Sequence, residues 1–197
     1  MRLLIASNSQ HKIREIRQIL APYYPDIQGL REAGLDIEVV EDGNSFAENA
    51  WKKASQVSQA TGFAALADDS GLCVDALDGA PGIYSARFSG VHGADQANNR
   101  LLLARLAGKP RPWTAHYACA IALCRPGLPP IQVEAYCQGE ILPEYRGNGG
   151  FGYDPLFLPA GCTETFAQMD AAQKNRISHR AKALALLLQA LESEARA

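Results

Sequence analysis

Apolar residues recur with two different spacings along this chain, and the two spacings predict a protein that contains both helices and strands. In residues 10–21 the apolar side chains return every three or four positions, which places them on one face of a helix. In residues 113–124 and 131–138 they alternate with a second set of side chains, which is typical of β-strands. The loop "RPGLPP" between these two strands is short, so we expect an antiparallel pair.

Capping and turn residues place the other elements. The tetrapeptide "SFAE" matches a capping box, with Ser45 as the N-cap and Glu48 as its partner. Asp95 is expected to cap a later helix. The predicted strands lie at 3–6, 37–40 and 63–67. The predicted helices lie at 45–62, at 95–108 and from 178 onward. Together they predict an α/β protein with a mixed sheet, and "GKPRPW" at 108–113 is expected to be a hinge between two lobes.

Composition narrows the class of protein. A chain of 197 residues with 47% hydrophobic and 20% charged residues suits one globular domain, or one domain with two lobes. The net charge of −2 argues against a general nucleic-acid binder. The apolar run at the N-terminus is too short for a signal peptide or a membrane span, so a cytoplasmic protein is expected. The five cysteines form no CxxC pair and predict free, mostly buried thiols.

The hexapeptide "ADDSGL" at 67–72 places two adjacent carboxylates after an apolar run. Asp, Ser and Gly are the residues that turns favour, so a turn alone would explain the motif. The alternative is a catalytic or metal-binding carboxylate at the end of a buried strand. We expect both, with Asp69 as the base and metal ligand and Asp68 as support. Glu41 is the candidate second carboxylate for a hard cation, which needs only one or two such ligands. Glu48 and Asp68 are the alternatives, although the capping box would explain Glu48 without any chemistry.

Cations are expected at two helix N-termini, where the helix dipole disfavours them. Lys12 lies in the first turn of a helix capped by Ser9, and His179 and Arg180 follow Ser178, with Lys174 just upstream. A bound phosphate would satisfy both the free backbone N–H groups and these cations.

The glycine-rich loop "RGNGGFGYDP" at 146–155 carries a different chemistry. Its glycines let the backbone approach a ligand closely, while Phe151 and Tyr153 offer flat faces and Asp154 offers acceptors. This combination suits stacking on a base and reading its edge.

Taken together, the segments "SFAENAWKKA", "ADDSGL", "GAPGIYSARFSG", "GGFGYDP" and "ISHRAKAL" resemble the inosine triphosphate pyrophosphatase family of RdgB-like house-cleaning nucleotide hydrolases. The resemblance covers nearly the whole chain. It implies a single ITPase-like domain over 1–197, with an elongated mixed β-sheet flanked by helices, two lobes with a cleft between them, and a homodimer. It also implies Mg²⁺-dependent hydrolysis of ITP, dITP and XTP to the monophosphate and pyrophosphate.

The resemblance assigns roles to particular residues. Asp69 corresponds to the general base and metal-associated carboxylate. The residues that correspond to substrate-binding positions are Ser7, Asn8, Ser9, Gln10, His11, Lys12, Ser70, Phe151, Gly152, Tyr153, Asp154, Lys174, His179 and Arg180. Ser9 stands where the family usually has Asn, with Asn8 one place early. The alternatives are a Maf-like nucleotide pyrophosphatase with another base preference and a nucleotide-binding sensor without turnover.

Overall fold

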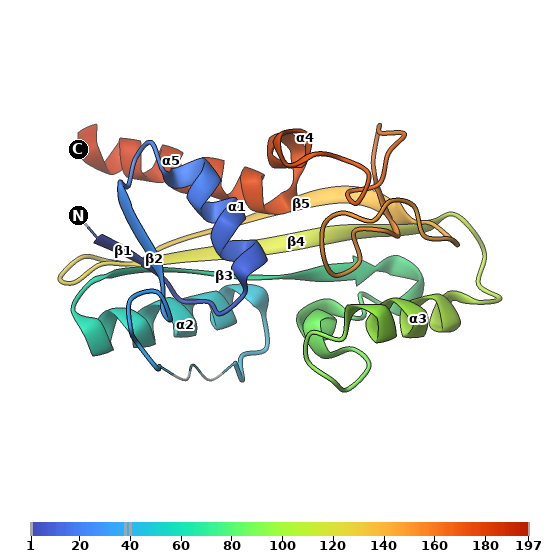
Figure 1. Cartoon of the computed structure of the whole chain (residues 1–197), viewed down its shortest axis with the longest axis horizontal. Coiled ribbons are helices and arrows are strands. Elements are labelled where there is room, and N and C mark those ends of the chain that lie inside the picture. Colours follow the sequence, from blue (N-terminus) through green and yellow to red (C-terminus); the bar gives the residue numbers. More distant parts are fainter. Residues whose placement is uncertain (1, 38, 40, 197) are drawn as a thin grey trace. The chain divides into compact units, whose positions relative to one another are not determined.

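The computed structural model describes residues 2–37, 39 and 41–196, which form a six-stranded sheet with helices (Figure 1). The strand order is β2-β1-β3-β4-β5-β6. The strands are β1 (Arg2–Ile5), β2 (Asp26–Gly29), β3 (Ala64–Val74), β4 (Trp113–Cys124), β5 (Ile131–Ile141) and β6 (Phe157–Pro159). The α-helices are α1 (Gln10–Leu20), α2 (Phe46–Thr61), α3 (Asp95–Leu106), α4 (Ala171–Ile177) and α5 (His179–Arg196), and two 3-10 helices are η1 (Asp75–Leu77) and η2 (Gly82–Arg87).

The sheet is mixed, as the sequence predicts. Strand β1 pairs in parallel with β2 and with β3, while β5 and β6 are antiparallel. Strands β4 and β5 are neighbours joined by the short loop 125–130, which only an antiparallel pair allows. The α/β class with a mixed sheet is therefore confirmed.

The chain divides into two compact units. Unit 1 comprises residues 1–69, 119–135 and 180–197, and unit 2 comprises residues 70–118 and 136–179. Strands β3, β4 and β5 each contribute one part to each unit. The predicted hinge at 108–113 lies wholly inside unit 2, so that assignment is wrong: the chain passes from one unit to the other within β3, β4 and β5 and at the start of α5. The single two-lobed domain stays a prediction.

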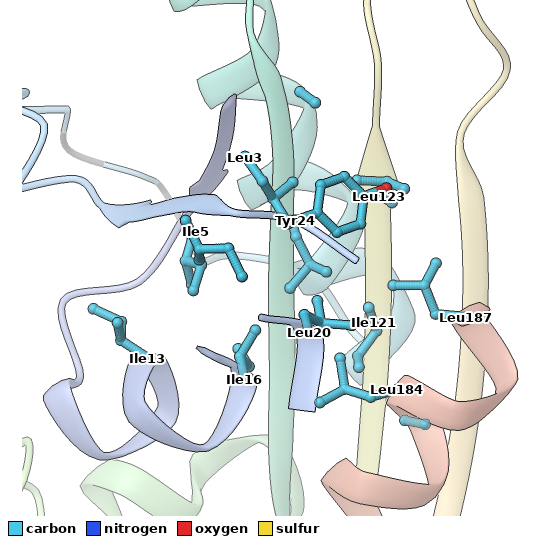
Figure 2. Close-up of a cluster of buried hydrophobic side chains, with 14 of the residues drawn as sticks. Leu3, Ile5, Ile13, Ile16, Leu20, Tyr24, Ile121, Leu123, Leu184 and Leu187 are labelled. Atoms are coloured by element: carbon cyan, nitrogen blue, oxygen red, sulfur yellow. The ribbon is translucent and has the colours of Figure 1, made fainter. Parts of the chain in front are cut away.

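Unit 1 buries both faces of its part of the sheet. Helices α1 and α5 cover one face with Ile13, Ile16, Leu184 and Leu187 (Figure 2), and α2 covers the other face with Ala50, Ala54 and Val57 (Figure 1). Successive side chains of a strand point to opposite faces of the sheet, so they contact the helices on one face and on the other in turn. Both faces of β4 in this unit are therefore apolar.

Unit 2 has a core of its own, in which aromatic side chains are prominent. Leu102 and Leu106 of α3 belong to the same buried cluster as Trp113 and Tyr117 of β4. Phe157 and Phe166 also belong to this cluster, and both rings lie within contact range of the Tyr117 ring. These aromatic residues support the glycine-rich loop described below.

Local signals place several helix ends where the sequence predicts them. Ser9 and Ser45 are the N-caps of α1 and α2, and Gly62, with φ +71°, ends α2 in the left-handed conformation. The carboxylate of Glu48, however, accepts from the N–H of Asn44 rather than from that of Ser45. Among the helices of the described residues, none combines the length and apolar character needed to cross a bilayer.

Three predictions of secondary structure differ from the structure. The strand predicted at 37–40 includes residues 38 and 40, which lie outside the described residues, and residues 37 and 39 are not in a strand. Asp95 does not cap α3: Ala94 is the N-cap, and Asp95 lies in the first turn with its carboxylate bonded elsewhere. The motif at 67–72 is not a turn, because β3 continues through it as far as Val74.

Candidate functional site

Asp68 and Asp69 are consecutive residues of one strand, so their side chains point to opposite faces of the sheet. Asp68 shares its face with Leu66, under α1 and α5, whereas Asp69 shares its face with Ala67, over α2. Both carboxylates are buried, with 1% and 8% of each residue exposed. Cations from distant segments neutralise them, and this is why the strand continues where local propensity favours a turn.

The partners of Asp68 come from both ends of the chain. Its Oδ2 accepts from Nε and Nη2 of Arg180 at 3.1 and 3.0 Å and lies 3.1 Å from Nζ of Lys12. Arg180 also donates to Glu15 of α1. Burial alone would raise the pKa of Asp68, but the charges of Lys12, Arg180 and Lys53 outweigh it and hold that pKa well below 3.8. Asp68 is thus a permanent anion that holds Lys12 and Arg180 in place.

The partners of Asp69 come from α2 and from the segment that precedes it. Nζ of Lys53 lies 2.8 Å from Oδ1 of Asp69 and 3.1 Å from Oε1 of Glu41, so one ammonium group is shared by two carboxylates. Asn49 donates to Oδ2 of Asp69 at 3.4 Å and accepts from the N–H of Gly43 at 2.8 Å. Burial raises the pKa of Asp69 above 3.8, against the opposing charges of Lys53 and Lys12. This carboxylate is therefore more basic than an exposed one.

The segment from Ser7 to Lys12 leads from β1 into the first turn of α1. Ser7 accepts from the N–H of Ser9, and Ser9 accepts from the N–H of Lys12. Asn8, Gln10 and His11 are exposed. Lys12 lies in the first turn, as predicted, and its Nζ reaches Asp68; the turn contains no acidic residue.

The glycine-rich loop of unit 2 folds back on its own carboxylate. Oδ2 of Asp154 accepts from the N–H of Phe151 at 2.9 Å. A Cβ at Gly150 would collide with the Asp154 carboxylate, and Gly150 and Gly152 both have positive φ, of +71° and +62°. Glycine at these two positions is what allows the loop to close on Asp154.

Lys174 completes this arrangement. Its Nζ lies 2.7 Å from Oδ2 of Asp154, and also 4.7 Å from the centre of the Phe151 ring and 5.4 Å from that of Phe166. Lys174 lies in α4, a helix that the sequence analysis did not predict and that begins with a capping box formed by Asp170 and Gln173. The structure therefore brings Phe151, Asp154 and Lys174 together, as a cation and a carboxylate beside an aromatic face.

His179 is the first residue of α5 and is buried against the same aromatic cluster. Its ring stacks on Tyr117 with 4.5 Å between the centres and 8° between the planes. The hydroxyl of Tyr117 accepts from the N–H of Tyr153, a residue of the glycine-rich loop. Ser70, on β3, is half-buried. His179 and Arg180 thus occupy the first two positions of the last helix, as predicted.

The comparison with protein families decides the relationship. The profile of the Ham1 family matches residues 3–190, which is nearly the whole chain. The chain belongs to the Ham1 family. The dITP/XTP pyrophosphatase of Geobacter sulfurreducens is 48% identical over 187 residues, covering 94% of each chain, and that of Desulfotalea psychrophila is 47% identical over 183 residues, covering 93% of this chain and 82% of the relative.

Solved structures agree with the assignment to the Ham1 family. The Ham1 protein of Staphylococcus aureus has a TM-score of 0.88 and 39% identity, with 98% of this chain and 100% of that chain covered. A HAM1 protein from Coxiella burnetii has a TM-score of 0.86 and 36% identity, over 98% of this chain and 99% of that one. The family that the motifs indicate is therefore confirmed.

The donor set around Lys53 fits a hard divalent cation of the kind that nucleotide pyrophosphatases generally need. Among the described residues there is no cluster of three or more His, Cys, Asp or Glu side chains that would hold a metal. Asp69 and Glu41 nevertheless converge on one position that a cation, the Lys53 ammonium, already occupies. Two carboxylates suffice for Mg²⁺, which keeps several waters and prefers oxygen ligands.

Four residues of this candidate site were missed by the sequence analysis, and two of them left a signal. The buried stripe of α2 contains Asn49 and Lys53, one turn apart, between Ala50, Ala54 and Val57. A lysine within an apolar stripe indicates a buried counter-ion, because lysine is almost never buried unless paired. Glu15 and Tyr117 gave no such signal, since their roles depend on contacts with segments far away in the sequence.

Proposed function

We propose that this chain hydrolyses non-canonical purine nucleoside triphosphates, namely dITP, ITP and XTP, to the monophosphate and pyrophosphate in a Mg²⁺-dependent reaction. The observation that carries the proposal is the pair Asp69 and Glu41, two carboxylates that share one cation position in a chain whose relatives are named dITP/XTP pyrophosphatases. Asp69 is buried and held at both oxygens, so its orientation is fixed before substrate arrives.

Asp69 serves as the general base. It accepts a proton from a water molecule, whose oxygen attacks the α-phosphorus, and the bond from that phosphorus to the bridging oxygen breaks to release pyrophosphate. Because burial raises the pKa of Asp69, the carboxylate is a stronger base than an exposed aspartate. Asp69 and Glu41 would hold Mg²⁺, which neutralises the charge that collects on the phosphate oxygens.

Lys12 and Arg180 bind the phosphates of the substrate. Both are positioned by Asp68, and Lys12 lies in the first turn of α1, so the positive end of that helix and the cation would act on an anion together. An ordered cation costs less conformational entropy on binding than a mobile one, since its rotamer is already restricted.

The aromatic cluster of unit 2 binds the purine base of the substrate. Phe151 offers a face for stacking, and His179 is a candidate donor to O6 of hypoxanthine or xanthine. Adenine presents an N6 amino group at the same position, so donor would face donor and one buried group would lose its hydrogen bond, at a cost of about 1–3 kcal/mol. The arrangement therefore favours 6-oxopurines over adenine.

The test is a pyrophosphate-release assay with ITP, dITP, XTP, GTP, ATP and dTTP, each with and without Mg²⁺. We expect turnover of ITP, dITP and XTP that requires Mg²⁺ and a kcat/KM for ATP at least about tenfold lower, the size of one lost hydrogen bond. Preferential hydrolysis of dTTP would indicate the Maf-like alternative, and binding without release of pyrophosphate would indicate a sensor. Either result would refute the proposal.

The homodimer implied by the family resemblance and the cytoplasmic location expected from the N-terminal sequence belong to the same proposal. Light scattering on the full chain after size-exclusion chromatography tests the first, and fractionation of the source cells tests the second. A monomer at micromolar concentration would contradict the dimer without affecting the proposed chemistry.

A further inference from the structure

Helix α3 holds one residue of the glycine-rich loop by both of its backbone polar groups. Oδ2 of Asp95 accepts from the N–H of Gly152 at 2.6 Å, and Nδ2 of Asn99 donates to the carbonyl of Gly152 at 2.8 Å. Asp95 and Asn99 are four residues apart on α3 and therefore lie on the same face of that helix. The pair forms a clamp, and neither residue was a candidate on sequence grounds.

The clamp acts on a residue whose own backbone angles are little restricted by sterics. Glycine has the widest choice of backbone angles, and Gly152 adopts φ +62° between Phe151 and Tyr153. Its N–H belongs to the peptide plane shared with Phe151, and its carbonyl belongs to the plane shared with Tyr153. Fixing both planes fixes φ and ψ of Gly152, and with them the direction of the Phe151 side chain relative to Tyr153.

The neighbouring amides show that the loop is held residue by residue. The N–H groups of Phe151, Gly152 and Tyr153 donate in turn to Asp154, Asp95 and Tyr117. Asp154 belongs to the loop itself and Tyr117 to β4. The plane on each side of the glycine has one further bond, from Asp154 N–H to the Phe151 carbonyl and from Tyr153 N–H to Tyr117, whereas α3 bonds to both planes through the glycine itself.

We propose that Asp95 and Asn99 are positioning residues that orient Phe151 and Asp154 for recognition of the purine base. The inference rests on the proposed function, since it concerns the base of the same substrate. Neither residue touches the reacting atoms. Without the clamp, the free enzyme samples loop conformations that do not bind the base. The apparent affinity for substrate then falls in proportion to the fraction of molecules that keep the binding-competent conformation.

Asn98 provides a matched control on the same helix. It is as deeply buried as Asn99, at 2% against 3% exposed, and its amide bonds to two backbone groups of another segment, whereas the amide of Asn99 bonds to the carbonyl of Gly152. It accepts from the N–H of Ser89 and donates to the carbonyl of Ala86, without contact to Gly152. Removing the amide of Asn98 should therefore cost at least as much stability as removing that of Asn99, but only the loss of Asn99 removes a bond to the glycine-rich loop.

The experiment compares Asn99→Ala, Asp95→Ala, Asp95→Asn and Asn98→Ala with the wild type in the full chain. Thermal melting, steady-state hydrolysis of dITP, and inhibition of that hydrolysis by dIMP and by inorganic pyrophosphate are measured for each. For Asn99→Ala and Asp95→Ala we expect KM for dITP and the inhibition constant of dIMP to rise about tenfold, the size of one lost hydrogen bond. We expect kcat and the inhibition constant of pyrophosphate to stay near wild-type values.

The controls separate positioning from stability. Asp95→Asn keeps an oxygen that accepts from the Gly152 N–H, so it should restore the wild-type KM. Asn98→Ala should melt at a lower temperature, like Asn99→Ala, with wild-type KM. Faster hydrogen exchange of residues 146–155 in the two clamp variants alone would support the same conclusion without reference to activity.

Two results would overturn the inference, and they differ from failure of the proposed function. Unchanged KM and dIMP inhibition in both Asn99→Ala and Asp95→Ala would show that the clamp does not orient the base site. An equal rise of KM in Asn98→Ala would show that only stability matters. A wild type that hydrolyses neither dITP nor XTP would refute the proposed function itself, and the inference with it.

Discussion

Replacing Lys53 by Met tests whether its ammonium group holds the acid pair together at the position that we propose for a divalent cation. Methionine keeps most of the length and the apolar stem of lysine and removes the charge. Asp69 and Glu41, which lie 2.8 and 3.1 Å from that charge, would then face each other without it. The substitution therefore creates a repulsive acid pair within an otherwise unchanged fold.

The size of the effect follows from burial. Removing one partner of a buried ion pair costs about 3–5 kcal/mol, because the other charge is left without compensation. Here Asn49 still donates to Asp69, and the side chain of Glu41 is 37% exposed, so water relieves part of the cost. We expect a loss of about 2–4 kcal/mol at pH 7, which lowers Tm by about 5–15 °C in a chain of this size.

The loss should depend on pH in one direction. Burial already raises the pKa of Asp69, and Lys53 opposes that rise, so the Lys53→Met variant has a still higher pKa there. A carboxyl with a raised pKa destabilises the folded state above its unfolded pKa, and this penalty disappears as pH falls and the group binds a proton. The difference in Tm from wild type should therefore shrink as pH falls from 7 toward 4.

Mg²⁺ should reverse the loss, because the variant presents the two carboxylates without a competing cation. Thermal melting across a MgCl₂ titration should show a larger stabilisation, at lower Mg²⁺ concentration, in Lys53→Met than in wild type. Lys52→Met is the matched control, since Lys52 pairs with the exposed Asp42 and Glu48. Its Tm and its response to Mg²⁺ should match wild type.

The reasoning fails if Lys53→Met without Mg²⁺ melts at the same temperature as Lys52→Met. It also fails if Mg²⁺ stabilises both variants equally, because the acid pair would then not be the cation site. A titration with NaCl at the same ionic strength separates specific binding from screening of charge.

Three further predictions concern Asp69, Asp68 and Lys12. Asp69→Asn should keep its fold and lower kcat by about 10²–10⁴-fold, the usual effect of losing a general base; kcat within tenfold of wild type at saturating Mg²⁺ would exclude that role. Asp68→Asn should lose about 2–4 kcal/mol at neutral pH, measured by denaturant unfolding. Because the folded pKa of Asp68 lies below 3.8, that loss should be complete above pH 3.8 and fade as pH falls further; a loss that fades already at pH 6 would contradict the assignment. Lys12→Ala should lower kcat/KM for dITP chiefly at low salt, and an equal ratio to wild type at 20 and 500 mM NaCl would show that the lysine is not a phosphate ligand.

Local chemistry predicted much of the framework. Ser9 and Ser45 lie where α1 and α2 begin, and Gly62 lies where α2 ends, because caps act within one turn of the chain. The alternation in residues 113–124 matched β4, since period two is a property of any extended chain with buried faces. Helix α4 also carried a local signal, the capping box of Asp170 and Gln173, which the sequence analysis did not use.

The sequence analysis could not predict that cations far away in the sequence neutralise the two adjacent aspartates. Asp, Ser and Gly favour a turn at 67–72, but β3 runs straight through because Lys12, Lys53 and Arg180 meet the two carboxylates from three helices. The same holds for Asp95, which was expected to cap its own helix and instead accepts from Gly152. A charged side chain bonds to the partner that the fold brings near, and that partner is not visible in a window of ten residues.

The adjacent aspartates are explained by the period of a strand. One carboxylate faces α1 and α5, where it organises Lys12 and Arg180, and the next faces α2, where it shares Lys53 with Glu41. A pair spaced by two residues would put both charges on one face, with like charges close together and the opposite cations unpaired. Consecutive acidic residues place one carboxylate on each face of the sheet. A shift of β3 by one residue would exchange the proposed base with the anion that positions the cations.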